Sequence, residues 1–402
     1  MAKKRSSTSM VIEVSRYVYQ TLRADEEFAL SRARQNGEQS TVLVVAPVSE
    51  YPALGSLARL EHEYSLRDEL DSDWALRPLA LTRRQGGMML VLDDPGGEPL
   101  DQCLAKPMEL GRFLRLAINM AAGLGKLHRR WLIHKDVKPA NILVDLATDK
   151  VWFTGFGIAS RLPRERQAAE PPGVIAGTLA YMAPEQTGRM NRSIDSRSDL
   201  YSLGITFYQM LTGVLPFRAS DPIEWVHCHV ARQPPKPSEQ TARIPEAVSA
   251  IVLKLLAKTA EERYQTAAGL EADLRKCLME WESVGHIKSF TVGRQDVPDR
   301  LLIPEKLYGR DSACKTLLAA LDRVVATHKS ELVLLSGYAG IGKSSVVHEL
   351  HKVIVRPRGI FISGKFDQHR RDIPYASLAQ AFQELARQIL SKSEQEIIHW
   401  RN

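Results

Sequence analysis

The stretch LHRRWLIHKDVKPANILV, which spans residues 127–144, decides the fold of this chain. Its apolar ends enclose a polar centre, in which Asp136 follows His134 by two residues and Asn141 follows Asp136 by five. Taken alone, a histidine beside apolar residues is more often part of a core, and Asp136 and Asn141 would be surface loop residues. The stretch therefore gains its meaning from the motifs that follow it in order.

Three further motifs follow within about 130 residues: GTLAYMAPE at 177–185, DLYSLG at 199–204, and Arg263. Together with the first stretch they resemble the catalytic core of protein kinases, whose catalytic loop reads H-R-D-x-x-x-x-N. Lys135 stands in place of that arginine. The resemblance implies an α+β, two-lobed fold with a small β-rich lobe and a larger helical lobe.

The resemblance also implies roles for four residues. Asp136 would accept the proton of the substrate hydroxyl, and Lys138 would approach the transferring phosphate. Asn141 would hold Mg²⁺, and Thr178 would pack beside the catalytic aspartate. The spacing suits this chemistry because the carboxylate and the amide oxygen must face one cleft.

Four more residues would have structural roles. His134 belongs to the catalytic loop, and Asp199 would steady that loop from the start of a long buried helix. Glu185, the last residue of the A-P-E element, would pair with Arg263.

The parts that handle nucleotide in protein kinases do not match. Residues 11–60 contain only two glycines, so they cannot form a Gly-rich loop over the phosphates. No lysine occurs between Lys4 and Lys106, so the lysine of the third strand is absent, and Val44 is expected in its place.

The metal-binding aspartate is missing as well. TGFGIAS at 154–160 resembles T-D-F-G-I-A-S with Gly155 in place of the aspartate. Glu63 would be the partner glutamate of the first helix, left without its lysine. One lost charge-stabilising group costs about 10² to 10³ in rate, so phosphate transfer is expected to be slow or absent unless an unusual geometry compensates.

A second motif lies near the end of the sequence. GYAGIGKS fits the phosphate-binding loop G-x-x-x-x-G-K-[ST], with Gly337, Gly340, Gly342, Lys343 and Ser344 as its binding residues. The loop amides would cradle phosphates, the lysine would reach the β and γ phosphates, and the serine hydroxyl would hold Mg²⁺. This motif predicts binding of ATP.

Apolar residues around this loop predict a buried strand at 332–335 and a helix at 345–353. No later run of four apolar residues leads into an aspartate or glutamate, the Walker B element that would complete a magnesium site. We therefore expect a truncated ATPase.

The sequence divides into three parts. Residues 11–280 are predicted to form the kinase-like domain, with lobes at 11–92 and 98–280. A Gly- and Pro-containing linker at 281–306 would lead to a truncated AAA or P-loop ATPase domain at 307–402. The whole would be a two-lobed fold followed by the start of an α/β domain.

Composition sets broader limits. The 402 residues are 44% hydrophobic and 25% charged, which is typical of globular proteins, and the net charge of +7 is too low to indicate nucleic acid as a partner. The four cysteines are scattered, which favours a cytoplasmic protein. No stretch reaches 18 apolar residues, so no direct membrane segment is expected.

The phrases at 176–197, 302–310 and 336–345 resemble one larger family. These are bacterial signalling proteins that join a serine/threonine-kinase-like domain, a P-loop ATPase module and a C-terminal sensor histidine kinase. The resemblance implies a possible downstream histidine-kinase module, which this sequence does not contain.

Three functions remain open. In the first, the chain would be a serine/threonine protein kinase that uses ATP, Mg²⁺ and a protein substrate, with Asp136 as base. In the second, it would be a pseudokinase that passes a signal to its attached module through a signalling partner. In the third, it would be a nucleotide switch in which only the phosphate-binding loop handles ATP.

Overall fold

The computed structural model describes most of the kinase-like region and part of the remainder; the described residues are 17–35, 40–84, 87–161, 177–188, 192–241, 243–298, 309–338, 341, 343–348, 362–364 and 375–390. All structural statements below concern these residues.

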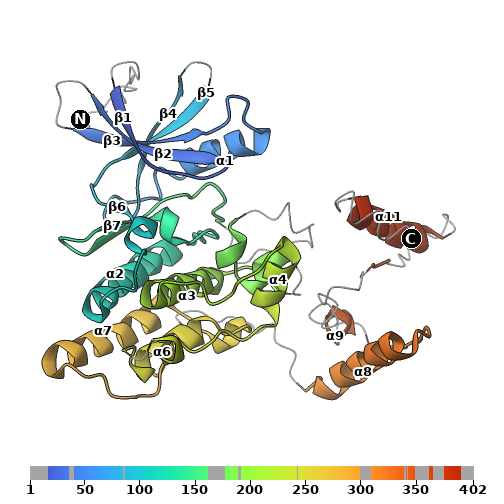
Figure 1. Ribbon diagram of the computed structural model, residues 1–402. Helices are drawn as coiled ribbons and strands as arrows, with labels where there is room; N and C mark the ends of the chain where they lie inside the picture. The colour runs from blue at the N-terminus through green and yellow to red at the C-terminus, as the bar shows by residue number, and fades with distance from the viewer. Residues whose placement is uncertain are drawn as a thin grey trace, which may run out of the picture.

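The small lobe is an antiparallel sheet in the order β1-β2-β3-β5-β4, accompanied by helix α1 (Figure 1). Valine-rich β3 lies at its centre, as expected for β-branched residues. The bounds are β1 Tyr17–Ala24, β2 Phe28–Gln35, β3 Thr41–Pro47, α1 Leu54–Ser65, β4 Pro78–Arg84 and β5 Gly87–Asp93.

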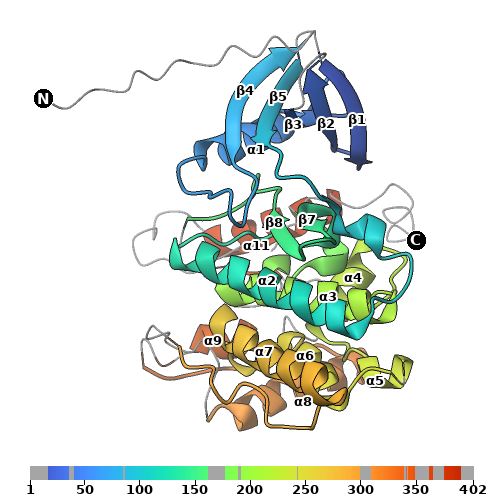
Figure 2. The same ribbon diagram turned by 90° about the vertical axis from the view of Figure 1, so that its left-hand side faces the viewer.

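A second sheet carries the end of the catalytic loop. Its strands are β6 (Glu98–Pro99), β7 (Ile142–Asp145) and β8 (Lys150–Phe153). They lie between the small lobe and helix α2, as Figure 1 shows for β6 and β7 and Figure 2 for β7 and β8. The short 3₁₀ turn η3 (Pro139–Asn141) leads directly into β7, so Asn141 sits where the chain enters this sheet.

The large lobe is helical. Its longest helices pack around one core, and short 3₁₀ turns connect them. The bounds are η2 Leu100–Cys103, α2 Leu110–Arg129, η4 Leu179–Tyr181, η5 Pro184–Thr187, α3 Ser196–Thr212, α4 Pro222–Val230, α5 Pro237–Gln240, α6 Glu246–Leu255, η6 Ala260–Glu262 and α7 Ala267–Val284.

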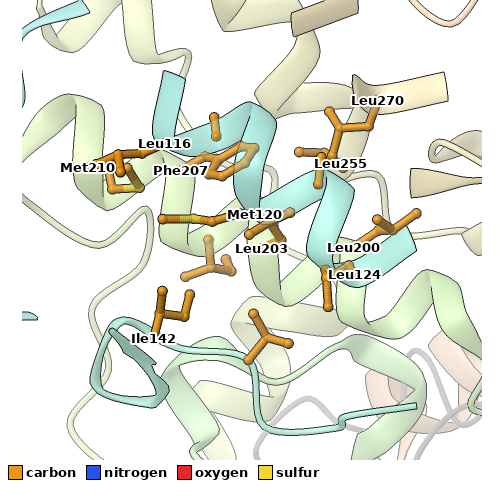
Figure 3. Close-up of a cluster of buried hydrophobic side chains, with 14 of the residues drawn as sticks. Leu116, Met120, Leu124, Ile142, Leu200, Leu203, Phe207, Met210, Leu255 and Leu270 are labelled. Atoms are coloured by element: carbon orange, nitrogen blue, oxygen red, sulfur yellow. The ribbon is translucent and has the colours of Figure 1, made fainter. Parts of the chain in front are cut away.

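Helix α2 presents the apolar face that its sequence predicts. Figure 3 shows Leu116, Met120 and Leu124 of α2 among side chains of α3, α6, α7 and β7. The rings of Phe113 and Phe207 meet edge to face at 5.3 Å, which joins α2 to α3. The predicted two-lobed fold is confirmed.

The described part of the expected linker lies against the large lobe. Ile287 is buried in the core. Asp296 accepts hydrogen bonds from the backbone of Gln265 (2.5 Å) and Thr266 (3.0 Å), just before α7. Residues 285–298 are therefore held on the base of the lobe.

Helices α8 (Asp311–Thr327), α9 (Lys343–His348) and α11 (Ala376–Leu390) follow. The prediction of a buried strand at 332–335 is wrong: these residues form no strand, and Leu332 and Leu334 are 85% and 84% exposed. A buried parallel strand needs neighbouring strands, and the described residues after 309 contain none. The predicted helix begins at Lys343, and residues 349–353 lie outside the described part.

Helices α3 and α6 approach closely at Gly204. A Cβ atom added there would lie 2.7 Å from the Cβ of Leu255, whereas one at Gly125 in α2 would meet only ordinary contacts beyond 3.5 Å. We expect Gly204→Ala to lower the free energy of unfolding by about 1–3 kcal/mol through overpacking. Gly125→Ala, the matched control, should be neutral or stabilising by about 0.5–1 kcal/mol. Urea unfolding of both variants measures the difference, and equal effects would contradict the close contact.

Candidate functional site

The catalytic loop is held by one buried carboxylate. Asp199, in the first turn of α3, is fully buried and accepts hydrogen bonds from the backbone of His134 and Lys135, both at 2.9 Å. Its Oδ2 also lies 2.9 Å from Nε2 of His128 at the end of α2. Asp199 thus joins two helices to the loop.

His134 is buried beneath this loop. Its Nε2 lies 3.0 Å from the carbonyl oxygen of Thr154, its Nδ1 accepts from the backbone N–H of Asp136 (3.3 Å), and its ring centre is 4.5 Å from that of Phe156. Burial lowers the pKa of His134, which favours the neutral ring that this pattern of one donor and one acceptor requires. The histidine therefore orients the loop.

The structure brings the four predicted catalytic residues together. Nζ of Lys138 lies 3.0 Å from Asp136 and donates to Oγ1 of Thr178 (2.6 Å). The backbone N–H of Thr178 donates to Asp136 (3.1 Å). Nδ2 of Asn141 donates to the carbonyl and the carboxylate of Asp136, at 2.9 and 2.8 Å. The carboxylate is thus oriented from three sides.

Glu185 and Arg263 also meet. They form a buried, two-pronged ion pair with N–O distances of 2.7 and 2.9 Å, and Oγ of Ser198 donates to the same carboxylate (2.6 Å). Although burial alone would raise it, the pKa of Glu185 is lowered because Arg263 and Ser198 stabilise the charged form. The pair ties the A-P-E turn to the start of α3 and to the segment before α7.

The turn between β1 and β2 is where a kinase would cover the phosphates. The carboxylate of Asp25 accepts the backbone N–H groups of Glu27 (2.9 Å) and Phe28 (2.7 Å). These amides are the groups that a Gly-rich loop would offer to phosphate. Here a side chain of the protein already uses them.

The same turn is fastened to α1. The carboxylate of Glu27 accepts a hydrogen bond from Oγ of Ser56 (2.7 Å) and forms an ion pair with Arg59. The tip of the hairpin is therefore held against the N-terminal half of α1.

Arg23, near the end of β1, reaches the catalytic loop. Its Nη2 donates to Oδ1 of Asn141 at 2.9 Å, and its side chain is only 13% exposed. With Nδ2 bonded to Asp136, both polar atoms of the Asn141 side chain are bonded within the protein. Sequence reasoning missed Arg23, because a single arginine on an edge strand carries no motif.

Gly155 occupies the place of the metal-binding aspartate with φ at +79°, and an added Cβ would lie 2.8 Å from the amide group of Asn141. Its N–H donates to Glu63 of α1 at 3.2 Å. Burial raises the pKa of Glu63 to about 7. Glu63 therefore bonds the backbone of the G-F-G turn instead of a lysine.

The expectation for Val44 is wrong by one residue. Val44 packs with Ala33 and Met89 on one face of the sheet, whereas Leu43 and Val45 belong to the cluster that contains Leu60 of α1. Because side chains alternate along a strand, the β3 side chain nearest to α1 is an apolar neighbour of Val44. Residues 43–45 include no lysine, so the lysine of the third strand is absent whichever of these positions matches it.

The apolar side of the cleft is closed. Leu143 of β7 is fully buried in the same cluster as Leu22 of β1 and Leu43 of β3. The two lobes thus meet through leucine side chains at this point.

These donors do not fit a magnesium ion in the cleft between the lobes. Mg²⁺ requires oxygen ligands at about 2.0–2.1 Å, but Oδ1 of Asn141 already accepts from the cationic Arg23, and Gly155 supplies no carboxylate. In the described residues, no group of three or more His, Cys, Asp or Glu is arranged to hold a metal ion.

The phosphate-binding loop is described in part. Nζ of Lys343 donates to the carbonyl oxygens of Gly337 (2.7 Å) and Tyr338 (2.8 Å), so it faces neutral acceptors that a phosphate would outcompete. Ser344 follows at the start of α9 and is exposed. Gly340 and Gly342 lie outside the described residues. The Lys343 ammonium and the Ser344 hydroxyl therefore fit the phosphates and the metal ion of a magnesium nucleotide.

A two-lobed fold with an oriented aspartate at a loop between the lobes defines a protein-kinase domain. The chain belongs to the protein kinase family: the model of the protein kinase domain matches residues 46–274, more than half of the chain. The model of the AAA ATPase domain matches residues 306–402.

Curated relatives match the kinase region. A hybrid signal transduction histidine kinase G of Dictyostelium discoideum is 35% identical over 56% of this chain and 7% of its own length. The serine/threonine-protein kinase PknB of Mycobacterium tuberculosis is 39% identical over 42% of the chain and 26% of its own length. The serine/threonine-protein kinase pkn3 of Myxococcus xanthus is 29% identical over 55% and 42%. The chain therefore spans less than half of each of these relatives.

None of the described helices combines the length and the apolar character needed to cross a membrane.

Removing Arg263 should be costly because it leaves the Glu185 carboxylate buried and unpaired. We expect Arg263→Ala to lower the free energy of unfolding by about 3–5 kcal/mol. Arg275→Ala, which removes an exposed pair with Glu271, should cost less than about 0.5 kcal/mol. Urea unfolding followed by tryptophan fluorescence compares the two. A loss below about 1 kcal/mol for Arg263→Ala would show that the pair does not anchor the A-P-E turn.

Glu63 should make stability depend on pH. Its folded pKa of about 7 exceeds the ordinary 4.5, so below pH 4.5 both states are protonated and no penalty arises. As the pH rises to 7 the unfolded state ionises first, and stability falls by about 3 kcal/mol. Glu63→Gln keeps an acceptor for Gly155, and its stability advantage over the parent should grow by about 2–3 kcal/mol as the pH rises from 5 to 8.

The matched control for this change is Glu61→Gln, an exposed position on the same helix. Chemical unfolding at the two pH values measures both variants. A stability difference between Glu63→Gln and the parent that stays constant with pH would contradict the raised pKa.

Proposed function

We propose that the chain is a regulatory module of a kinase-family signalling protein, in which the kinase-like domain carries a conformational or partner-binding signal and does not transfer phosphate. The observation that carries this proposal is the state of Asn141, the remaining magnesium ligand of the family pattern. Its side chain is bonded to Asp136 and Arg23 within the protein. A magnesium ion bound to Oδ1 of Asn141 would lie close to the guanidinium of Arg23, and the two positive charges would repel each other.

Three other features support the same function. Asp25 uses the amides of the β1–β2 turn, Glu63 bonds the backbone of Gly155, and Leu143 is buried against the small lobe. Each takes up a group or a space that a magnesium nucleotide would need. Because the large-lobe anchors are intact, the domain keeps a defined surface for a partner.

The second candidate is phosphate transfer to a protein serine or threonine by an unusual geometry. The arrangement of Asp136, Lys138 and Thr178 favours it, since the carboxylate is oriented as a base would be. In that case Asp136 is the base, Lys138 stabilises the transferring charge, and Asn141 must exchange Arg23 for Mg²⁺.

We assign nucleotide binding to the ATPase region. Lys343 and Ser344, with Gly337, Gly340 and Gly342 of the same loop, would hold ATP, with Mg²⁺ on the serine hydroxyl. The third candidate, a nucleotide switch confined to this loop, is thus contained in the proposal. We place the kinase-like domain at 11–280, with lobes at 11–92 and 98–280, the linker at 281–306 and the ATPase at 307–402, as the two family matches support.

We further propose that the natural protein is bacterial and cytoplasmic and continues into a histidine-kinase module. A relative whose name includes hybrid histidine kinase supports this architecture.

Transfer of radiolabelled phosphate from ATP to a generic protein acceptor and to the chain itself tests the regulatory function. In a Lys343→Ala background, which removes the ATPase site, we expect turnover at least about 10³-fold below the ordinary kinase range of about 1–100 per second. Asp136→Ala should leave that residual incorporation unchanged, as should the control Asp68→Ala at an exposed position. Incorporation that Asp136→Ala abolishes and Asp68→Ala preserves would establish a kinase instead.

A further inference from the structure

The segment after helix α7, residues 285–298, turns back along that helix, and we call it the strap. The backbone N–H of Lys288 donates to the carboxylate of Glu280 (2.8 Å), which lies in the C-terminal half of α7. Further along, the backbone N–H of Gly293 donates to the carboxylate of Asp273 (2.5 Å), which lies in the N-terminal half. The strap therefore follows α7 from its end toward its beginning.

Asp296 of the strap sits on the N-terminus of α7. Its carboxylate accepts hydrogen bonds from the backbone N–H groups of Gln265 (2.5 Å) and Thr266 (3.0 Å) and from the Thr266 hydroxyl (2.8 Å). Gly269 in the first turn leaves room for it, since an added Cβ there would lie 2.5 Å from the Cβ of Asp296. Free N–H groups and the helix dipole favour a negative charge at this end of a helix. The seat therefore suits an acidic side chain.

The residue that Asp296 bonds also contacts the anchor of the A-P-E turn. Oε1 of Gln265 accepts a hydrogen bond from Nη1 of Arg197 (2.9 Å), and its Nε2 donates to the carbonyl oxygen of Arg263 (2.8 Å). The guanidinium of Arg263 holds Glu185 of the A-P-E turn and donates to the carbonyl oxygen of Arg197 (3.1 Å). One residue, Gln265, thus connects Asp296 with the ion pair that holds the turn.

The two halves of the strap are held in different ways. In the first half, Ile287 is buried in the core of the large lobe, and Phe290 and Val292 pack against it. At the other end Asp296 is held by hydrogen bonds, and the next residue, Val297, is 74% exposed. A segment with few buried apolar contacts opens locally at low cost. Because the AAA ATPase match begins shortly after this end, at residue 306, a rearrangement of the ATPase region reaches Asp296 before the apolar half.

We propose that the strap is a latch between the ATPase region and the A-P-E turn. With Asp296 seated on α7, Gln265 is fixed and the turn is held; when Asp296 is withdrawn, Gln265 is freed and the turn loosens. The structure shows the latch engaged, so a signal from the ATPase region acts by releasing it. The proposal rests on the regulatory function, because it names the route by which the kinase-like domain and its attached module exchange a signal.

Hydrogen exchange of the full chain, followed by mass spectrometry, tests the latch in two segments, residues 179–188 and 285–298. The rate in each segment is divided by that of residues 113–120 in the core of α2, which corrects for a loss of global stability. We expect Asp296→Asn to raise both corrected rates by about threefold to thirtyfold, the range of a lost helix cap. If Asp296 served only as a cap for α7, residues 179–188 would not respond, and the latch would be refuted.

A second variant displaces Asp296 without changing its charge. Gly269→Ala should also raise both corrected rates, although alanine is the better helix former, because the added Cβ meets Asp296. The matched control is Gly125→Ala in α2, where an added Cβ meets only ordinary contacts; it should change neither rate by more than about twofold. Equal effects of the two glycine variants would contradict the proposal.

The role of Gln265 is tested with Gln265→Ala, which keeps the backbone N–H that Asp296 accepts. In this background Asp296→Asn should still speed exchange in residues 285–298, but it should add less than about twofold in residues 179–188, because the connecting side chain is gone. An undiminished effect on residues 179–188 would show that the contact does not pass through Gln265.

The signal itself is tested with saturating ATP and Mg²⁺. In the parent chain both segments should exchange at least about fivefold faster, the lower end of ordinary coupling between sites, and Lys343→Ala should abolish the response. Rates that ATP leaves unchanged in the parent would refute a latch controlled by the ATPase region. The two proposals fail separately: phosphate incorporation that depends on Asp136 would refute the regulatory function, whereas the exchange rates report on the latch in either case.

Discussion

The buried carboxylate of Asp199 is the constraint on which the catalytic loop depends. It accepts two backbone N–H groups of the loop and lies against His128, so the end of α2, the start of α3 and the loop share one centre. A carboxylate buried in this way requires partners on several sides. The loop therefore keeps its geometry whether or not the cleft performs chemistry, and Asp136, Lys138 and Thr178 remain in contact around it.

The small lobe has changed much more. Its strands and α1 keep the kinase arrangement, but apolar side chains and Arg23 lie where the family has a Gly-rich loop and a strand lysine. The G-F-G turn of the large lobe has Gly155 in place of the aspartate. Glu63 and Asp25 bond backbone amides of their own lobe or of the G-F-G turn. The same fold thus encloses a site with a different distribution of charge: Arg23 occupies the side-chain oxygen of Asn141, and Gly155 supplies no carboxylate. Both changes disfavour a metal ion there.

The base of the large lobe joins the kinase-like domain to the segment that follows it. Asp296 bonds the backbone of Gln265, and the side chain of Gln265 accepts from Arg197, which lies beside the Glu185–Arg263 pair. The described part of the expected linker is therefore in contact with the same turn that anchors the A-P-E element. Apolar contacts add to these polar bonds: Ile287 is buried in the core of the large lobe, and Phe290 and Val292 pack against that core.

Much of the fold and half of the site could be predicted from residue order. The spacing of Asp136 and Asn141, the A-P-E element and Arg263 indicated the two lobes, because these motifs recur at fixed distances along the chain. The assignment of Val44 was off by one residue, since a strand alternates between faces and its register is set by pairing with β5. The strand expected at 332–335 was not found, because a strand needs neighbours that local sequence cannot supply.

By itself, the sequence determined which chemical groups the cleft lacks, because a missing lysine, aspartate or glycine loop can be seen without coordinates. Only the tertiary structure decided what takes their place. Arg23 and Asn141 are 118 residues apart. They meet where the pairing of β1 with β2 shifts its register, between Thr21 and Arg23, beside a loop that Asp199 holds in place. No local pattern encodes such a contact, since it depends on strand register, on the packing of α1 and on the meeting of two lobes.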